Sequence, residues 1–201
     1  MFSIKGLAVL AIVIGAAAAS AAAQAGNPHE GIPKAEVAVD YSYMRANATP
    51  GQCGCFNLNG GSAEFAIHAY KNFSAVADIT GEHAGTTSIP GQSLSLLSYA
   101  GGPRFSYPLR RSQRTRITPF VQGLVGAVHG FDAPFPQSSG ALTNSANALA
   151  VFVGGGVDIA VSRRFAIRAV QVDYGLNHLP NNANNSENLL RVSTGVVFRI
   201  R

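Results

Sequence analysis

The side chains that could move protons or pair charges are spread along the chain and are not gathered in one short motif. Ten of them share the polar face of segments that alternate polar and apolar residues: Glu36, Asp40, Glu64, His68, Asp78, Arg104, Asp158, Gln171, Asp173 and Arg191. Buried charges are costly unless they are paired, so this mixture predicts a ladder of ion pairs and hydrogen bonds. A proton-coupled gate or a narrow ion path is the alternative for the same residues.

Side-chain parity within the segments predicts the neighbours of several charged groups. Arg104 is expected to be the central cation among three carboxylates: Glu64, Asp78 and Asp158. If the first and last segments pair, Glu36 and Asp40 face a segment that carries two guanidinium groups, Arg191 and Arg199. Arg168 has the opposite parity to the polar positions that follow it. It therefore marks either a β-bulge or a position near the turn at 162–165.

The remaining residues contain no catalytic or metal-binding motif. Metal sites need clustered ligands, whereas the five histidines are scattered: His29, His68, His83, His129 and His178. Gly154-Gly155-Gly156 is not followed by Lys and Ser or Thr, so it indicates a narrow, bent strand and not a phosphate loop. Along the sequence, no histidine lies two or three residues from a serine on the apolar face, so no Ser–His nucleophile is indicated. We therefore expect no catalytic residue, no cofactor and no bound metal.

The two cysteines are close together and do not make a disulfide framework. Cys53 and Cys55 flank Gly54 in a polar connection. In an oxidising compartment they are expected to form a small, strained disulfide that stiffens the connection. Soft-metal binding by two thiolates is one alternative, and free or intermolecularly paired thiols are the other.

Alternation with a period of two residues dominates the chain after residue 33, and it predicts strands rather than helices. Eight runs show this pattern, over about residues 36–43, 64–69, 75–80, 97–105, 117–126, 151–159, 170–174 and 190–200. Large apolar side chains occupy one face of these runs. Small, hydroxyl-bearing and charged side chains occupy the other face.

The composition indicates which of these faces points outward. The chain is 47% hydrophobic and 12% charged, with three lysines among 201 residues. A soluble sandwich would need a charged exterior, so a barrel that is apolar outside and polar inside fits better. After residue 25 no apolar stretch is long enough for a spanning helix. We predict an all-β fold, an eight-stranded antiparallel up-and-down transmembrane β-barrel, with a soluble lipocalin-type barrel as the alternative.

The N-terminus has the three parts of an export signal. Lys5 precedes an apolar core at 7–14, and an Ala-rich tail ends in Ala23-Gln24-Ala25, a small-residue cleavage pattern. Cleavage is expected near Ala25, with Ala23 as the alternative site. The predicted organisation has three parts: a cleaved signal peptide at 1–25, a short periplasmic segment at 26–33 and the barrel at 34–201.

The connections between the runs alternate between short and long, as in barrels of the bacterial outer membrane. The long polar connections, which would face outside, are expected at 47–59, 84–92, 130–146 and 177–188. Basic residues gather at the opposite end, among them Lys34, Lys71, Arg163 and Arg164. They are expected to anchor the barrel at phospholipid headgroups. Docking to an acidic periplasmic partner or to the cell wall is the alternative.

The chain resembles the superfamily of small outer-membrane β-barrels of the OmpA-like and OmpX-like kind. The resemblance covers about residues 33–201 and rests on the architecture and on short segments: Ala77-Asp78-Ile79-Thr80-Gly81, Gly102-Pro103-Arg104-Phe105, Thr118-Pro119-Phe120, Gly154-Gly155-Gly156-Val157-Asp158, Val172-Asp173-Tyr174 and Gly195-Val196-Val197-Phe198-Arg199. Many members end in Phe, whereas this chain ends Phe198-Arg199-Ile200-Arg201. The resemblance implies a Gram-negative-type cell envelope and a role in membrane integrity, adhesion or stress resistance.

Taken together, these patterns favour a non-enzymatic barrel of the cell outer membrane with a structural or surface-interaction role carried by its long external loops. A narrow solute-conducting, ion-conducting or ligand-binding barrel is the alternative, and a lipid-modifying enzyme is the third hypothesis. The expected partners are outer-membrane lipid, lipopolysaccharide and the barrel assembly machinery, and we expect a monomer. The arginines are not interleaved with aromatic residues on a helix, so no nucleic-acid partner is expected.

Overall fold

The computed structural model describes residues 33–47, 55–87, 91–110, 116–136, 140–181 and 186–200. This part of the chain contains eight long strands and one two-residue strand: β1 (Ala35–Asn47), β2 (Cys55–Tyr70), β3 (Phe73–Ala84), β4 (Leu94–Ser106), β5 (Leu109–Arg110), β6 (Arg116–Pro136), β7 (Leu142–Ala160), β8 (Phe165–Asn177) and β9 (Glu187–Ile200). Within these ranges, no helix has the length and apolar character needed to cross a bilayer. The predicted signal peptide and its cleavage site lie outside the described residues.

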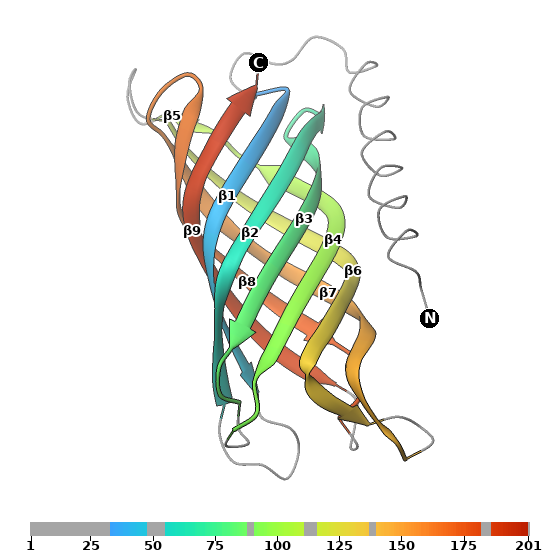
Figure 1. Ribbon diagram of the computed structural model, residues 1–201. Coiled ribbons are helices and arrows are strands. Elements are labelled where there is room, and N and C mark those ends of the chain that lie inside the picture. Colours follow the sequence, from blue (N-terminus) through green and yellow to red (C-terminus); the bar gives the residue numbers. More distant parts are fainter. Residues whose placement is uncertain are drawn as a thin grey trace.

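The eight long strands form one closed antiparallel barrel (Figure 1). Neighbours in the chain pair with each other, β1 pairs with β9, and β4 pairs with β6. The short β5 pairs with the start of β6, inside a stretch that the sequence predicts as a connection. The predicted eight-stranded antiparallel barrel is therefore confirmed.

The two ends of the barrel differ in their connections. At one end, here called the terminal end, β1 begins and β9 stops, with Ala35 opposite Ile200. At the opposite end, the loop end, connections of five to nine residues join β1 to β2, β3 to β4, β6 to β7 and β8 to β9, whereas the terminal end has two short turns and the connection 107–115 that contains β5. The predicted long loop at 130–146 is wrong in its length, because β6 and β7 leave only residues 137–141 between them. Strand pairing resumes after an irregularity between Phe131 and Phe135.

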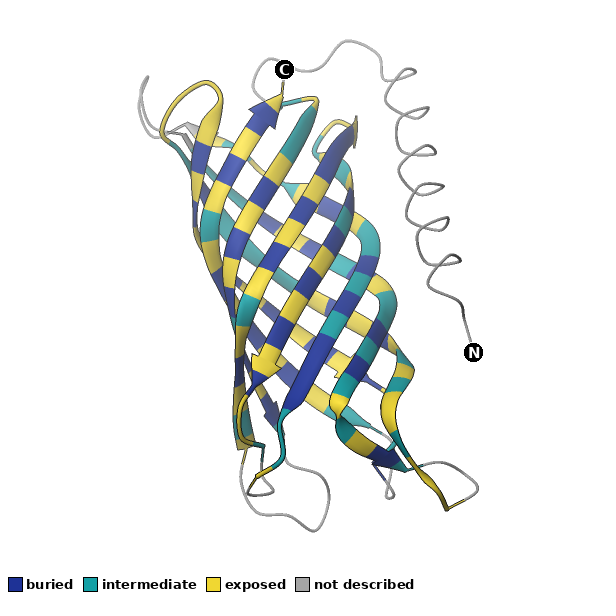
Figure 2. Ribbon diagram, viewed as in Figure 1, coloured by how far each residue is buried: buried dark blue, intermediate teal, exposed yellow. Residues whose placement is uncertain are grey.

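Each strand has one outward and one inward face, because exposed and buried residues alternate along it (Figure 2). The outward face is apolar even where it is most accessible. Val39 is 64% exposed, and Val121 and Val153 are each 61% exposed. This face matches the apolar band of membrane-spanning barrels.

A β-bulge in β8 brings an additional arginine into the lumen. The pairing of β8 with β9 shifts register between Arg168 and Gln171, and its pairing with β7 shifts between Val157 and Asp158. One extra residue reverses the side-chain parity of a strand. Arg168 is accordingly turned inward and is 1% exposed. Of the two alternatives for Arg168, the structure shows the bulge.

The run Gly154-Gly155-Gly156 lies within β7, as the sequence predicts, and leaves room for lumenal side chains. A β-carbon on Gly156 would lie 2.8 Å from Cζ of Phe120. A β-carbon on Gly154 would lie 2.3 Å from a carboxylate oxygen of Asp173. Glycine at these two positions therefore lets a ring and a carboxylate lie directly against the barrel wall.

Candidate functional site

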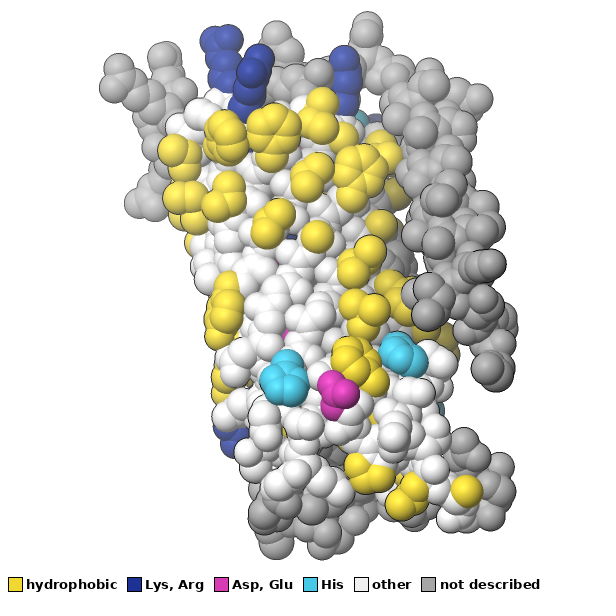
Figure 3. All heavy atoms as spheres, viewed as in Figure 1, with side chains coloured by type: hydrophobic (Ala, Val, Ile, Leu, Met, Phe, Trp, Pro, Cys, Tyr) yellow, Lys and Arg dark blue, Asp and Glu magenta, His cyan; other side chains and the backbone are white. Residues whose placement is uncertain are grey.

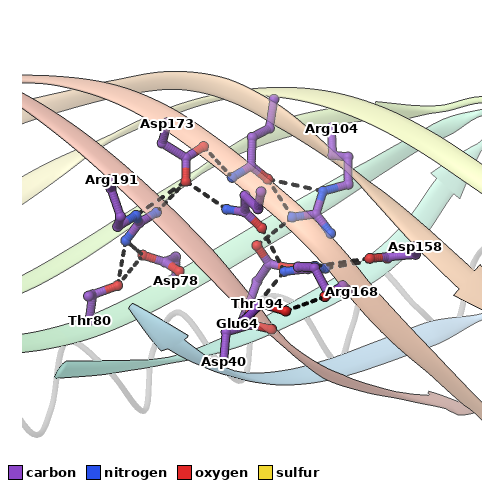
Figure 4. A network of polar contacts seen from close by, with 12 residues as sticks. Asp40, Glu64, Asp78, Thr80, Arg104, Asp158, Arg168, Asp173, Arg191 and Thr194 are labelled. Atoms are coloured by element: carbon purple, nitrogen blue, oxygen red, sulfur yellow. Dashed lines mark hydrogen bonds and ion pairs between the residues drawn. The ribbon is translucent and has the colours of Figure 1, made fainter. Parts of the chain in front are cut away.

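The polar residues that the sequence singles out lie on the inward faces of the strands. Nine of the ten are buried, and Glu36 is half-buried near the terminal end. Figure 4 shows that those in the middle of the barrel converge from different strands. Three arginines organise them: Arg104 from β4, Arg168 from β8 and Arg191 from β9.

Arg168 is the centre of the network. Its guanidinium nitrogens lie 3.0 Å from Asp158, 3.0 Å from Glu64 and 3.1 Å from Asp40. It also donates a 2.7 Å hydrogen bond to the side-chain oxygen of Gln171. Carboxylates from β7, β2 and β1 thus share one cation. In a lumen with little room for water, this arrangement compensates charges that would otherwise be costly to bury.

Arg104 has fewer ionic partners than the sequence predicts. It forms an ion pair with Glu64 and donates to the side-chain oxygen of Gln122. Its guanidinium carbon lies 4.1 Å from the ring centroid of Phe120. The other two expected carboxylates pair elsewhere: Asp158 with Arg168 and Asp78 with Arg191. The prediction of Arg104 as the central cation is therefore wrong, because the bulge in β8 places another guanidinium among the same acids.

Arg191 holds a second group of acids, nearer the loop end. Its guanidinium nitrogens lie 2.9 Å from Asp173 and 3.0 Å from Asp78. It also donates to the hydroxyl of Thr80, which in turn donates to Asp78 over 2.9 Å. The ion pairs are therefore embedded in hydrogen bonds from neutral groups.

Two glutamine amides connect the groups of ions. Gln122 donates to Asp173 over 3.2 Å, and its oxygen accepts from Arg104 over 3.0 Å. Gln171 donates to Asp173 over 2.7 Å, and its oxygen accepts from Arg168. A continuous network of this kind is strong in a low-dielectric interior. We call it the charged layer, and its members are Asp40, Glu64, Asp78, Arg104, Gln122, Asp158, Arg168, Gln171, Asp173 and Arg191.

An ion pair lies at the terminal mouth of the lumen. Glu36 on β1 is opposite Arg199 on β9, and the two side chains approach to 3.0 Å. A cavity of about 20 Å³ beside this pair is also lined by His68 and Asp158. A cavity of this size holds about one water molecule, so it does not admit a solute.

The half of the lumen nearer the loop end is largely apolar, which the sequence analysis missed. Its buried side chains pack into one cluster, here called the apolar plug: Met44, Leu58, Leu96, Leu124, Val128, Phe135, Phe152, Leu179 and Leu189. Phe135 follows the irregularity in β6, and Leu179 belongs to the connection between β8 and β9. For the other plug residues, the sequence does contain a signal of their inward position. Residues such as Met44 and Leu124 share the parity of polar positions on the same strands.

Glu82 is another lumenal residue that sequence reasoning missed. It is 5% exposed and accepts a hydrogen bond from the hydroxyl of Ser42. Its parity with Asp78 on β3 is the signal that could have placed it inside. Among the described residues of β1, β2, β3, β7 and β8, seven acids face the lumen together with four arginines of β4, β8 and β9: Glu36, Asp40, Glu64, Asp78, Glu82, Asp158 and Asp173 with Arg104, Arg168, Arg191 and Arg199.

A serine, a histidine and an acid meet on the outer surface at the loop end. The hydroxyl of Ser95 donates to Asp132 over 2.7 Å and lies 2.9 Å from Nδ1 of His83. In a catalytic triad the histidine takes the serine proton and the acid orients the histidine. Here the acid holds the serine itself, and Ser95 is 7% exposed. The arrangement ties β4 to its two neighbours instead of presenting a nucleophile.

The remaining candidates for metal or thiol chemistry are dispersed. Cys55 is exposed at the start of β2. Cys53 lies outside the described residues, so the predicted disulfide stays a prediction. His129 is bonded to Asn147. Within the ranges that the structure describes, no group of three or more His, Cys, Asp or Glu residues could hold a metal ion.

Comparison with known proteins finds similarity in the fold but not in the sequence. No protein-family model and no curated protein matches the chain. Neisserial surface protein A superposes with a TM-score of 0.61, at 16% identity, over 85% of this chain and all of its own. Ail, the attachment invasion locus protein of Yersinia pestis, superposes with a TM-score of 0.50, at 13% identity, over 84% of this chain and 99% of its own. The chain therefore has the fold of the small eight-stranded β-barrels of the bacterial outer membrane.

Proposed function

We propose that the chain is a non-enzymatic, non-conducting barrel of the outer membrane with a structural or surface-interaction role. The observation that carries this proposal is the filled lumen. The charged layer occupies the lumen towards the terminal end, and the apolar plug occupies it towards the loop end. The cavity at the terminal mouth has room for about one water molecule. A barrel filled in this way is a membrane-anchored platform and has no path for solutes.

The outer surface supports a membrane location. Val39, Val121 and other large apolar residues are exposed around the barrel wall. At the terminal end, Lys and Arg side chains project beyond the apolar band (Figure 3). Lys71 and Arg163 are exposed there, and cations of this kind bind anionic phospholipid headgroups. The terminal end would then face the periplasm, and the connections at the loop end would face the outside.

The proposed interaction role belongs to the loop end. Ail, a structural neighbour, is by its description an attachment invasion locus protein, and one of its structures holds the heparin analogue sucrose octasulfate. For the present chain we propose that the external loops make the contacts and that the barrel holds them in place. We further propose that lipopolysaccharide surrounds this end. In this proposal the barrel assembly machinery inserts the chain as a monomer.

Cell fractionation followed by gel electrophoresis tests the proposal. The protein is expected in the outer-membrane fraction, beginning near Gly26, with a different gel mobility before and after boiling. Reconstituted in planar bilayers, it is expected to give no discrete conductance. Recovery from the soluble periplasm would contradict the membrane location. Discrete channel openings would favour the conducting alternative, and a change in lipid A mass on overexpression would favour an enzyme.

A further inference from the structure

A hydrogen-bonded pair recurs on the outer surface of each described hairpin that opens towards the loop end. In each pair, a tyrosine or histidine ring on the outgoing strand contacts a small polar side chain on the returning strand. The four pairs are Tyr41 with Asn59, His83 with Ser95, His129 with Asn147, and Tyr174 with Asn188. We call these eight residues the loop-end collar.

The loop-end collar lies at the edge of the apolar band. On β7, Asn147 is the next outward residue beyond Leu149, and on β9 Asn188 is the next beyond Leu190. Tyr41 on β1 adjoins Val39 on the same face and leans towards the loop end to reach its partner. In a membrane this is the level at which acyl chains give way to headgroups.

Charge distinguishes this level from the opposite edge of the barrel. At the loop-end collar, the exposed cation Arg45 is balanced by the exposed acid Asp132. At the terminal end, four basic side chains are exposed: Lys34, Lys71, Arg163 and Arg164. Phenylalanine pairs lie nearby, with ring centroids 5.2 Å apart for Phe73 and Phe105. Figure 3 shows Lys and Arg at the terminal end and His with an acidic side chain near the loop end.

Because the two edges of the barrel differ in charge, they suit different lipid headgroups. A phosphate only accepts hydrogen bonds and is best held by cations. A sugar hydroxyl both donates and accepts, and it needs no charge. In the pair of Tyr41 and Asn59, the amide oxygen accepts a hydrogen bond from the tyrosine hydroxyl over 2.7 Å. The amide N–H groups of Asn59 can then donate outward, and the phenolic oxygen can accept.

We propose that the loop-end collar binds the hydroxyl-rich sugar headgroups of glycolipids in the outer leaflet, through neutral hydrogen bonds and without requiring phosphate. The proposal rests on the proposed function, because it needs the loop end to lie in the external leaflet. It also assigns the two ends to different leaflets. The cationic terminal end binds anionic phospholipid, and the neutral collar binds the sugar hydroxyls of the outer-leaflet glycolipid.

Native mass spectrometry of the folded barrel in detergent tests the proposal with two lipids of matched acyl chains. Digalactosyl diacylglycerol represents the neutral sugar headgroup, and phosphatidylglycerol represents the phosphate. Replacing three collar amides together (Asn59→Ala, Asn147→Ala and Asn188→Ala) is expected to weaken galactolipid binding about tenfold. That change corresponds to three lost hydrogen bonds at the lower end of their usual contribution. Phosphatidylglycerol binding is expected to stay unchanged.

The matched control removes exposed cations at the other end (Lys71→Ala, Arg163→Ala and Arg164→Ala). It is expected to weaken phosphatidylglycerol binding and to leave galactolipid binding intact. If the collar variant loses binding of both lipids equally, or keeps its galactolipid binding, the proposal is overturned. Equally tight binding of free digalactose, which would indicate a soluble sugar, would also overturn it. A barrel that keeps its heat-dependent gel shift while failing this test leaves the proposed function standing.

Discussion

The charged layer and the apolar plug fill the same barrel by opposite means. Both consist of inward-facing residues, and they share the strands that form the wall. In the charged layer, the acids depend on one or two guanidinium groups, as Asp158 depends on Arg168 at 3.0 Å. In the plug, Leu124 and its neighbours depend on shape alone. Loss of one partner leaves an uncompensated charge in the first region, but only a void in the second.

The order of the two regions along the lumen affects the strength of the ion pairs. The apolar plug separates the charged layer from the loop end, and Phe152 of the plug lies 5.2 Å from the guanidinium carbon of Arg191. An apolar neighbour excludes water and lowers the local dielectric, which strengthens each ion pair beneath it. The same environment raises the cost of breaking a pair. The largest mutational effects are therefore expected in the charged layer.

Removing the central cation should have the largest effect. Arg168→Met leaves the carboxylates of Asp40 and Asp158 without their cation, so we expect the free energy of unfolding to fall by about 3–5 kcal/mol. Urea unfolding of the refolded barrel, followed by circular dichroism and gel mobility, measures the loss. The chain has no tryptophan for intrinsic fluorescence.

Two further variants separate lost charge pairing from lost packing at Arg168. Arg163→Met removes an exposed arginine at the terminal end and should change stability little. The double variant Arg168→Met with Asp158→Asn should recover part of the loss, because one of the stranded charges is also removed. No recovery would show that the side chain acts through packing.

Shortening a plug residue should have an intermediate effect. Leu124→Ala removes a side chain that is 1% exposed, so we expect a loss of about 2–4 kcal/mol from lost burial and the remaining void. Leu149→Ala, on the outward face of β7 and 58% exposed, is the matched control and should cost less. Equal losses in the two variants would contradict tight packing of the plug. Neither variant should conduct ions, because the charged layer still closes the lumen.

Arg104→Met should cost less than Arg168→Met, although the sequence analysis placed Arg104 at the centre. Glu64 would keep its 3.0 Å ion pair with Arg168, and Nη1 of Arg104 has no hydrogen-bond partner to lose. We expect a loss of about 1–3 kcal/mol, mainly from the uncompensated hydrogen-bonding groups. The same urea titration shows which of the two arginine substitutions lowers the free energy of unfolding more. A larger loss for Arg104→Met would restore the original assignment.

Period-two alternation and the low charge content were sufficient to predict the barrel, because alternation sets which side chains share a face of the wall and composition indicates which face points outward. The partners within the lumen depend on details that parity does not contain. One extra residue in β8 turns Arg168 inward, and its parity in the sequence indicated a bulge only as one of two alternatives, without indicating which acids it would pair with. Met44 and Leu58 have the correct inward parity, yet apolar residues were expected outside. Such residues can fill a lumen once it is closed to water, and closure is a property of the whole barrel.

The smallest expected effect comes from an acidic residue at the loop-end edge of the plug. It is measured as a change in the free energy of unfolding with pH. Glu187 begins β9, three residues before Leu190 and beyond the apolar band, and burial raises its pKa from 4.5 to about 7. Between these values the unfolded chain releases its proton first, so the free energy of unfolding should fall as pH rises through this window. We expect a fall of about 1 kcal/mol, since the side chain is only half-buried. Glu187→Gln should reduce the pH dependence by this amount in urea titrations at pH 4.5 and 7.5. An unchanged pH profile would mean that water reaches this carboxyl group, and the apolar half of the lumen would then end below Glu187.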